Sequence, residues 1–317
     1  MSRARPRRRV VRAAALIAVL ALSGCGGDDD DAPTAAEPSG LPAAEAPQAN
    51  RVVDPAAPPP SINALDIDPV ANEFLLTTNR GFFRIGRDSG EITQVRGTVR
   101  SGATTANVGT SLELAVSGRG RLIGSGHPDQ GGALPEFLGV MTSADGGRTW
   151  RVVSRLGEAD LHRIVMKHDR MYGFDAVTGA LLVSRDDAKT FSEQFTPSGV
   201  PIADLEVDPA NPRRIVAASD AEMYRSTNGG AAWKPLGGAS GARLAWPARD
   251  ALYRALKDGG VQVSGDGGSS WETAGRIDGE PYRLKAVSRE ELYLVIGDGT
   301  ILHTRDGAKT WDAAFKP

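Results

Sequence analysis

The chain has 317 residues, with 37 Lys and Arg against 39 Asp and Glu, and a single cysteine. A chain of this length can bury a sizeable core without disulfides. Six arginines fall within the first 12 residues, so the remainder carries 31 basic against 39 acidic side chains, a formal charge of −8. That acidic balance argues against nucleic acid and polyanionic lipid surfaces as partners.

Residues 1–24 have the pattern of a secretory signal, with a basic start, an apolar run over residues 13–22 and small residues before Cys25. The apolar run is too short to span a bilayer. The sequence Leu22-Ser23-Gly24-Cys25 resembles the bacterial lipobox, which implies a lipid on Cys25 in the mature protein. We therefore expect a lipid anchor on the outer side of the bacterial cytoplasmic membrane, or a periplasm-facing one; an ordinary signal peptide is the alternative.

Residues 25–61 begin with an aspartate run and continue as a stretch dominated by alanine and proline. Such a composition cannot bury enough apolar surface to fold. We interpret this segment as a tether between the anchor and a folded domain over residues 62–317.

The folded domain repeats an eight-residue turn sequence whose cleanest copy is Ser143–Trp150. The five copies start at Ser143, Ser184, Ser226, Ser264 and Thr304, which are 41, 42, 38 and 40 residues apart. A turn that recurs at about 40 residues is typical of a propeller with four-stranded blades. We predict an all-β fold, a six-bladed β-propeller of four-stranded antiparallel blades that start near residues 62, 111, 161, 202, 242 and 282.

The fourth unit shows the predicted strand order best. Its strands are expected at 202–207, 214–217, 223–226 and 232–236. In each turn the acidic or amide side chain can accept backbone N–H bonds, and the closing aromatic can pack between blades. The turn residues with this structural role are Asp145, Asp186, Asn228, Asp266 and Asp306.

Five such turns in register resemble the Asp-box (BNR) repeat family over residues 62–317. That family includes bacterial sialidases and other exo-acting glycosidases, and also sortilin-type receptors and photosystem-assembly propellers without glycosidase activity. The resemblance therefore implies the fold and not the function. Within the family, segments 126–128 and 157–162 look most like exported bacterial lipoproteins labelled glycosyl hydrolase or exo-sialidase.

One upper loop, residues 125–138, is predicted to be longer than its equivalents, and it contains His127 and Asp129. His162 begins the inner strand of the third unit and is expected near the same channel mouth. The two histidines, with Asp129, Asp160 or Glu113, could bind a divalent ion, because histidine is a frequent metal ligand. The alternative is a pair of polar loop histidines without an ion. No other cofactor is predicted.

Alignment of the inner strands places five charged residues at one equivalent position: Glu113, Arg163, Asp204, Arg243 and Arg283. The family resemblance suggests a catalytic interpretation, because a sialidase holds its substrate carboxylate with an arginine cluster and uses a tyrosine nucleophile partnered by a glutamate. Tyr282 and Glu280 would then join Arg163, Arg243 and Arg283 as catalytic residues. The alternative is that these charges pair between blades.

We therefore expect a membrane-tethered extracytoplasmic propeller that binds a glycan, peptide or protein ligand through its upper face. The expected contacts are His127, Asp129, His162, Glu113 and Asp204. An exo-acting glycoside hydrolase of sialidase type is the first alternative. An assembly or scaffolding factor that uses the rim of the propeller is the second.

Overall fold

The computed structural model describes residues 60–118, 120–197, 201–238 and 241–317, all within one compact unit. The expected signal, the lipidated Cys25 and the expected tether, apart from its residues 60 and 61, lie outside these residues. Every regular element in the described ranges is a β-strand, and none of these ranges contains a helix of the length and apolarity that crossing a bilayer would need.

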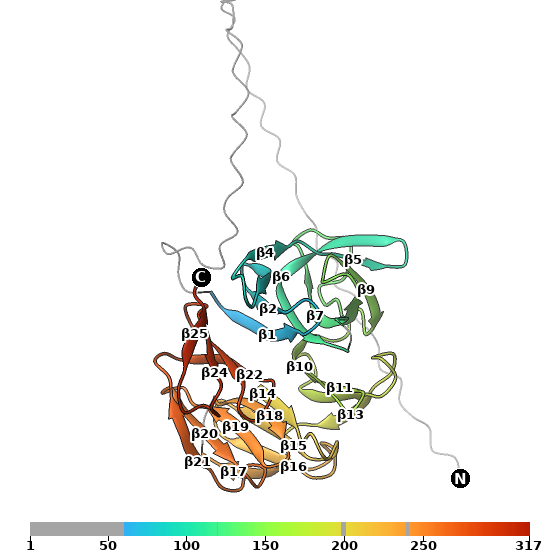
Figure 1. Cartoon of the computed structure of the whole chain (residues 1–317). Coiled ribbons are helices and arrows are strands. Elements are labelled where there is room, and N and C mark those ends of the chain that lie inside the picture. Colours follow the sequence, from blue (N-terminus) through green and yellow to red (C-terminus); the bar gives the residue numbers. More distant parts are fainter. Residues whose placement is uncertain (1–59, 119, 198–200, 239–240) are drawn as a thin grey trace, which may run out of the picture. The chain divides into compact units, whose positions relative to one another are not determined.

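Five four-stranded antiparallel sheets form blades, and each blade is named here by its inner strand (Figure 1). In each blade the strands pair in chain order, because short turns connect neighbours directly. The strands of the first three of these blades are β1 (Ile62–Asp68), β2 (Glu73–Thr78), β3 (Gly81–Gly86) and β4 (Ile92–Val95); β10 (Leu161–Lys167), β11 (Arg170–Asp175), β12 (Ala180–Ser184) and β13 (Ser192–Phe195); β14 (Ile202–Val207), β15 (Ile215–Ser219), β16 (Met223–Ser226) and β17 (Lys234–Gly237).

The last two blades complete the ring. Their strands are β18 (Arg243–Ala248), β19 (Ala251–Ala255), β20 (Gly260–Ser264) and β21 (Glu272–Arg276); β22 (Pro281–Ala286), β23 (Leu292–Ile296), β24 (Ile301–Thr304) and β25 (Asp312–Phe315). In the β14 blade the inner and third strands agree with the predicted bounds, and the second and fourth are displaced by one or two residues.

The prediction of six four-stranded blades is wrong for residues 98–154, so the propeller has five such blades. This segment forms a closed five-stranded sheet from β5 (Thr98–Ser101), β6 (Thr104–Val116), β7 (Leu122–Pro128), β8 (Val140–Ser143) and β9 (Thr149–Ser154). Closure occurs because the 13-residue β6 is long enough to pair with β7 and, through its first residues, with β5. Strand β5 then pairs in parallel with β9.

The closed sheet still contributes an inner strand. Strands β1, β6, β10, β14, β18 and β22 each contact the next around the axis, and β22 contacts β1. One apolar cluster fills each interface between neighbouring sheets. The interface between the β22 and β1 blades, for example, is filled by Phe74, Phe83, Tyr293 and Val295. The ring is thus held by packing between sheets, and the inner strands surround a channel.

The repeated turns have the hydrogen bonding that their sequence predicts. In the cleanest copy Asp145 accepts the Thr149 N–H at 2.9 Å and its hydroxyl at 2.6 Å, while the Ser143 hydroxyl accepts the Gly147 N–H. Gly147 has a φ of 91°, a region that favours glycine. The closing aromatics Trp150, Phe191, Trp233, Trp271 and Trp311 each pack against an interface cluster.

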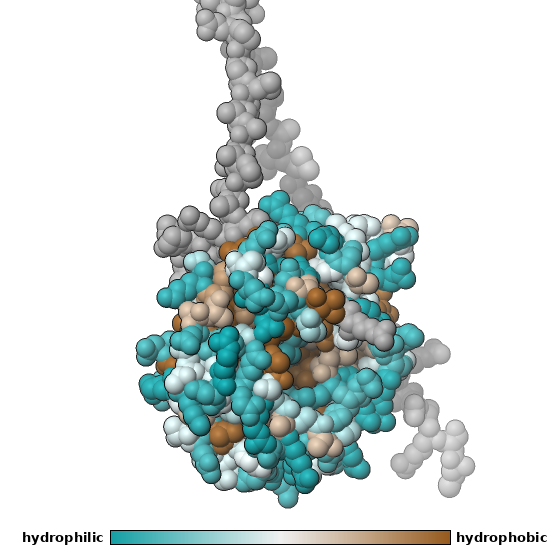
Figure 2. All heavy atoms as spheres, in the orientation of Figure 1, coloured by the Kyte–Doolittle hydropathy of each residue, from teal (hydrophilic) through white to brown (hydrophobic). Residues whose placement is uncertain are grey.

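Figure 2 shows a mostly hydrophilic surface with apolar residues gathered near the middle of the visible face. Exposed large apolar side chains are few among the described residues: Val70, Val177, Phe195 and Val287.

Candidate functional site

The channel contains a ring of five charged side chains from successive inner strands, the set predicted from the alignment. These are Glu113 of β6, Arg163 of β10, Asp204 of β14, Arg243 of β18 and Arg283 of β22. Three guanidinium groups therefore face two carboxylates. We call this set the charged ring.

Arg163 is neutralised inside the ring. Its Nε lies 2.5 Å from Asp204 Oδ1, and its Nη1 lies 3.6 Å from Glu113 Oε1. Arg163 and Glu113 are almost fully buried, and Asp204 is fully buried. Burial opposes the charge on Arg163, but Asp204 and Glu113 outweigh it and raise the pKa of this guanidinium.

The ring carboxylates also connect the inner strands. Asp204 Oδ2 accepts the backbone N–H of Leu244 at 2.9 Å, and Glu113 Oε1 accepts that of Ile164 at 3.3 Å. One layer below the ring, Asp66 Oδ2 accepts the N–H of Val116 at 2.9 Å. Each carboxylate therefore bonds the next inner strand. This structural role does not depend on a ligand.

Glu113 and Arg283 form the wall that the ring presents to the upper mouth. Burial raises the pKa of Glu113 to about 7, although the charges of Arg283 and Arg163 oppose this rise. Burial also lowers the pKa of Arg283 to about 10, although the nearby negative charge of Glu113 opposes this decrease. Arg283 Nη2 lies 3.9 Å from Glu113 Oε2, while its Nε and Nη1 donate to the carbonyl oxygens of Asn63 and Tyr282.

Arg243 differs from the other two ring arginines. Its Nε and Nη1 atoms are buried and have no hydrogen-bond partner in the described ranges, and no carboxylate there lies within ion-pair distance. A buried donor without an acceptor is costly. Arg243 is therefore the ring member with unused capacity to bind an anion.

Two histidines meet one carboxylate above the ring. His162 Nε2 lies 2.8 Å and His127 Nε2 lies 3.5 Å from the same atom, Oδ2 of Asp160. Burial opposes ionisation of Asp160, but the hydrogen bond from His162 and the charges of both histidines outweigh it and lower the pKa of Asp160. The hydrogen bond to Asp160 raises the pKa of His162.

The geometry does not support the predicted metal site. The Asp160 carboxylate is the group that contacts both imidazoles, and no set of three His, Cys, Asp or Glu side chains in the described part of the chain is arranged to hold a metal ion. In the sequence, Asp160 was one of three candidate third ligands, with Asp129 and Glu113. Its position two residues before His162 is the sequence feature that indicates contact between the two side chains.

The upper mouth is a cavity of about 340 Å³. Its polar lining comes from four inner strands, from β7 and from the residue before β10, and consists of Asn63, Ser111, Glu113, Ser125, His127, Asp160, His162 and Arg283. We call this cavity the mouth. It brings together His127, His162, Glu113 and Arg283 as predicted.

Several predicted site residues lie elsewhere. Asp129 lines a different cavity beside Gly109 and Arg80. Asp204 is covered by Arg163, and neither Asp204 nor Arg243 lines the mouth itself. Glu280 is exposed, and Tyr282 packs against the apolar cluster between the β22 and β1 blades. The proposed pair of Tyr282 and Glu280 therefore does not face the ring.

The predicted long loop is also shorter than expected. Strand β7 continues to Pro128, so His127 lies at a strand end and not within a loop. The loop that follows is fixed by buried Leu134 and Leu138, and Phe137 contacts the His127 ring edge-on at 5.6 Å. His127 is thus held in place by apolar packing.

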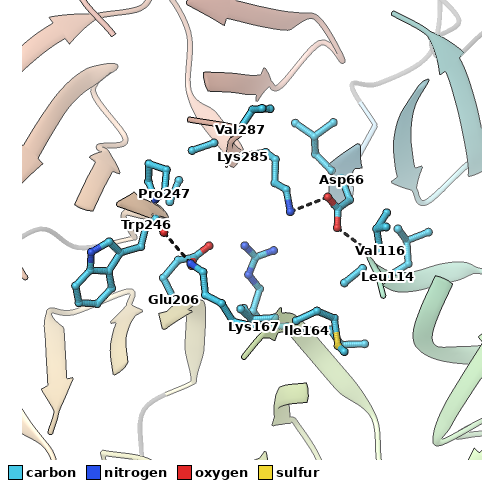
Figure 3. A pocket seen from close by; sticks show the side chains of 17 residues that line it. Asp66, Leu114, Val116, Ile164, Lys167, Glu206, Trp246, Pro247, Lys285 and Val287 are labelled. Atoms are coloured by element: carbon cyan, nitrogen blue, oxygen red, sulfur yellow. Dashed lines mark hydrogen bonds and ion pairs between the residues drawn. The ribbon is translucent and has the colours of Figure 1, made fainter. Parts of the chain in front are cut away.

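Below the ring lies a second cavity of about 220 Å³ (Figure 3). Lys285 and Asp66 point toward one another across it, with Nζ and Oδ1 2.7 Å apart. Lys167 Nζ lies 3.1 Å from Glu206 Oε2 and donates to the Trp246 carbonyl oxygen at 2.7 Å. Both lysines are already paired, so the lower cavity offers less free charge than the mouth.

Comparison with known proteins supports the fold. No protein-family model matches the chain. Dispase autolysis-inducing protein of Streptomyces mobaraensis is 32% identical over 99 residues, which are 31% of this chain and 26% of that protein. The match thus spans about a quarter of that relative's length.

Solved structures with a similar fold cover more of the chain. An ancestral GH74 enzyme has a TM-score of 0.52 at 13% identity, over 78% of this chain and 37% of that one. YCF48 from Cyanidioschyzon merolae has a TM-score of 0.48 at 13% identity, over 82% of this chain and 86% of that one. The GH74 xyloglucanase from Xanthomonas campestris has a TM-score of 0.46 at 18% identity, over 78% of this chain and 44% of that one. At these identities the likeness shows the fold alone. The chain is an all-β propeller of four-stranded antiparallel blades.

Proposed function

We propose that this chain is a binding module, tethered outside the cytoplasm through lipid on Cys25. We propose that it captures a carboxylate-bearing glycan or peptide at the mouth, with the carboxylate reaching the charged ring beneath it, where Arg243 lies close to Arg283. The observation that carries the proposal is the charge of the ring. Three guanidinium groups face two carboxylates, and Arg243 keeps two buried donors without an acceptor. A ligand carboxylate fits this excess, because a guanidinium binds it through two parallel charge-assisted hydrogen bonds.

The size and the charges of the mouth support the same proposal. Its volume of about 340 Å³ lies within the range of small-ligand sites. His162 has a side chain 58% exposed and a raised pKa, so it can present a positive charge to an incoming anion. Glu113 is half protonated near pH 7, which reduces the negative charge that would oppose binding.

Calorimetric titration of the full mature chain tests the proposal. The probes are N-acetylneuraminic acid, glucuronic acid and acetyl-Leu-Ala with a free C-terminus, each beside its methyl ester. We expect at least one acid to bind and its uncharged ester not to bind. An acid and its ester that bind equally would refute the proposal, as would the absence of binding by all three acids.

Two variants assign the binding to the ring. Arg243→Gln is expected to weaken binding of the acid by about tenfold, the effect of one lost charge-assisted interaction. Arg276→Gln is the matched control, because Arg276 lies on the outer strand β21 with an exposed side chain. Equal losses in the two variants would place the binding elsewhere.

An exo-acting glycoside hydrolase of sialidase type is the second candidate, and one observation favours it. Glu113 lines the mouth with a pKa raised to about 7, as a general acid requires. The wild-type chain and Glu113→Gln would be assayed on a panel of fluorogenic sialosides. Turnover that is lost in the variant would support this candidate, and no turnover by the folded wild type would exclude it for sialosides.

The anchor is a separate proposal with its own test. Cys25→Ser should move the protein from the membrane fraction to the soluble fraction of the producing cells, because lipidation needs the thiol. A variant that stays in the membrane fraction would contradict lipid attachment at this residue.

A further inference from the structure

A groove of about 590 Å³ lies between the closed sheet and the β10 blade, away from the mouth. Three arginines of the closed sheet line it: Arg100 of β5, Arg121 before β7 and Arg151 of β9. Met166 and Asp187 line its other side. We call it the arginine groove.

The strand register places two of these arginines side by side. Arg100 pairs with Arg151 across the parallel β5–β9 ladder, and with Thr105 across the β5–β6 ladder. Arg151 pairs in turn with Thr142 of β8. Paired residues project from the same face of a sheet, so Thr105, Arg100, Arg151 and Thr142 form one row across four strands.

This row is unfavourable as it stands. Like charges at directly paired positions destabilise a sheet. Within the described ranges no carboxylate forms an ion pair with any of the three arginines, and the one side-chain hydrogen bond among them joins Arg100 Nε to the Gly102 carbonyl oxygen at 2.8 Å. All three are exposed. The arginine groove is therefore a local cationic surface on an acidic chain, with its charge unused.

The element that creates the row is particular to the closed sheet. Strand β5 and the first residues of β6 supply Arg100 and Thr105, and no described four-stranded blade has an equivalent strand. Strand β5 also has a structural role, because Val99 is buried in the cluster between the β1 blade and the closed sheet. That role does not require an arginine at position 100, which places a second like charge against Arg151. An arginine there without an acid in the described ranges to pair with it suggests a role in binding.

The lining of the groove indicates the kind of ligand. Leu122, Ile123 and Trp150 are buried beneath the lining, so a ligand does not reach them. Met166 of β10 is half-buried and Ala144 is exposed, and these are apolar side chains that a ligand can contact. A peptide offers carboxylates for the arginines and an aliphatic side chain for Met166 together, whereas an acidic polysaccharide has no aliphatic side chain.

We propose that the arginine groove is a second binding site, which takes an acidic segment of a partner polypeptide. Two carboxylates of an extended segment bind Arg100 and Arg151, and a neighbouring aliphatic side chain packs against Met166. In an extended chain, residues i and i+2 project to the same side about 6.8 Å apart, and the long arginine side chains can span the difference from the spacing of about 4.8 Å between adjacent strands. Binding at this site is independent of carboxylate binding at the mouth.

Fluorescence anisotropy with the full mature chain tests this site. The probe is a fluorescein-labelled peptide with the central sequence Glu-Leu-Glu between Gly-Ser flanks, and the control peptide has Gln-Leu-Gln. We expect the acidic peptide alone to bind, and Arg100→Gln or Arg151→Gln to weaken it by about tenfold. Arg276→Gln should leave its affinity unchanged, and so should saturation of the mouth with the acid that binds there, which separates this site from the mouth.

The remaining outcomes are also decisive. Equal binding of the acidic and neutral peptides, or of the wild type and the Arg100→Gln/Arg151→Gln double variant, would overturn the proposal. Binding of an oligouronate without binding of the acidic peptide would overturn the assignment to a polypeptide. The melting temperature of unliganded Arg151→Gln provides a second measurement: it should not fall, because the substitution removes a like-charge contact.

Discussion

Arg163 Nε lies 2.5 Å from Asp204 Oδ1, so a guanidinium of β10 meets a carboxylate of β14 inside the channel. Because Asp204 also accepts the Leu244 N–H, this one contact links the inner strands β10, β14 and β18. It also explains why two of the five ring charges are unavailable to a ligand, and why Arg243 and Arg283 remain as the candidates for anion binding.

Asp204→Asn should lower the free energy of unfolding by about 3–5 kcal/mol, because it leaves Arg163 as a poorly compensated buried charge. Urea unfolding measures the change. Asp220→Asn is the control, since Asp220 is 77% exposed in its pair with Lys257 and such pairs contribute about 0–1 kcal/mol. Similar losses in both variants would contradict a structural role for the Arg163–Asp204 pair.

Carboxylate binding at the mouth should strengthen as pH falls from 8 to 6. Glu113, with a pKa near 7, loses its negative charge over this range, and His162 gains a positive one. Calorimetry at the two pH values measures the effect, and Glu113→Gln should reduce it. The same raised pKa means that the contribution of Glu113 to stability declines as pH rises from about 4.5 to 7. An affinity that does not change with pH would contradict this assignment.

Stability should fall below about pH 6.5 because of His303 in β24. This histidine is 6% exposed, stacks on Tyr293 at 4.2 Å and lies 3.3 Å from Glu291. Burial, with a contribution from Arg305, lowers its pKa, so the unfolded chain binds the proton more readily than the folded one. Melting temperatures at pH 7.5 and 5.5 measure the effect. His303→Gln should show a smaller decrease than the wild type, and an identical decrease would assign the effect to other groups.

Removing the turn carboxylate in Asp145→Ala should cost about 1–2 kcal/mol, because the Thr149 N–H and hydroxyl lose their shared acceptor. The cost stays modest because water can replace part of the interaction at this partly exposed turn. Chemical unfolding beside Asp312→Ala, an exposed acid of β25, provides the comparison. Equal stability of the two variants would show that the turn does not depend on Asp145.

The repeat spacing was sufficient to predict the propeller and most of its strands. A turn with one acceptor side chain and one closing aromatic forms locally, and its recurrence therefore reports the blade length directly. The alignment of inner strands also placed Glu113, Arg163 and Arg283 together in the channel. Both successes concern patterns that repeat along the chain.

The failures concern features outside the repeated turn. Strand β5 and the closure of its sheet depend on pairing between β5 and β9, which are about 50 residues apart and carry no shared motif. Tyr282 was placed with Arg283, but it lies where the register of β22 against β23 shifts, and its side chain packs into the core between blades. Asp160 was among the candidate partners of the two histidines, but the sequence did not distinguish a direct contact from shared metal ligation.

The most direct test of the central claim is to locate a bound carboxylate. Crystals of the mature chain soaked in 4-bromobenzoate, which does not alkylate histidine, would locate the ligand by the anomalous scattering of its bromine. The account predicts a bromobenzoate bound at the mouth with its carboxylate on Arg243 or Arg283, and the loss of that bromine peak in Arg243→Gln/Arg283→Gln. A mouth without bromine, while bromobenzoate occupies other arginines of the same crystal, would contradict the account.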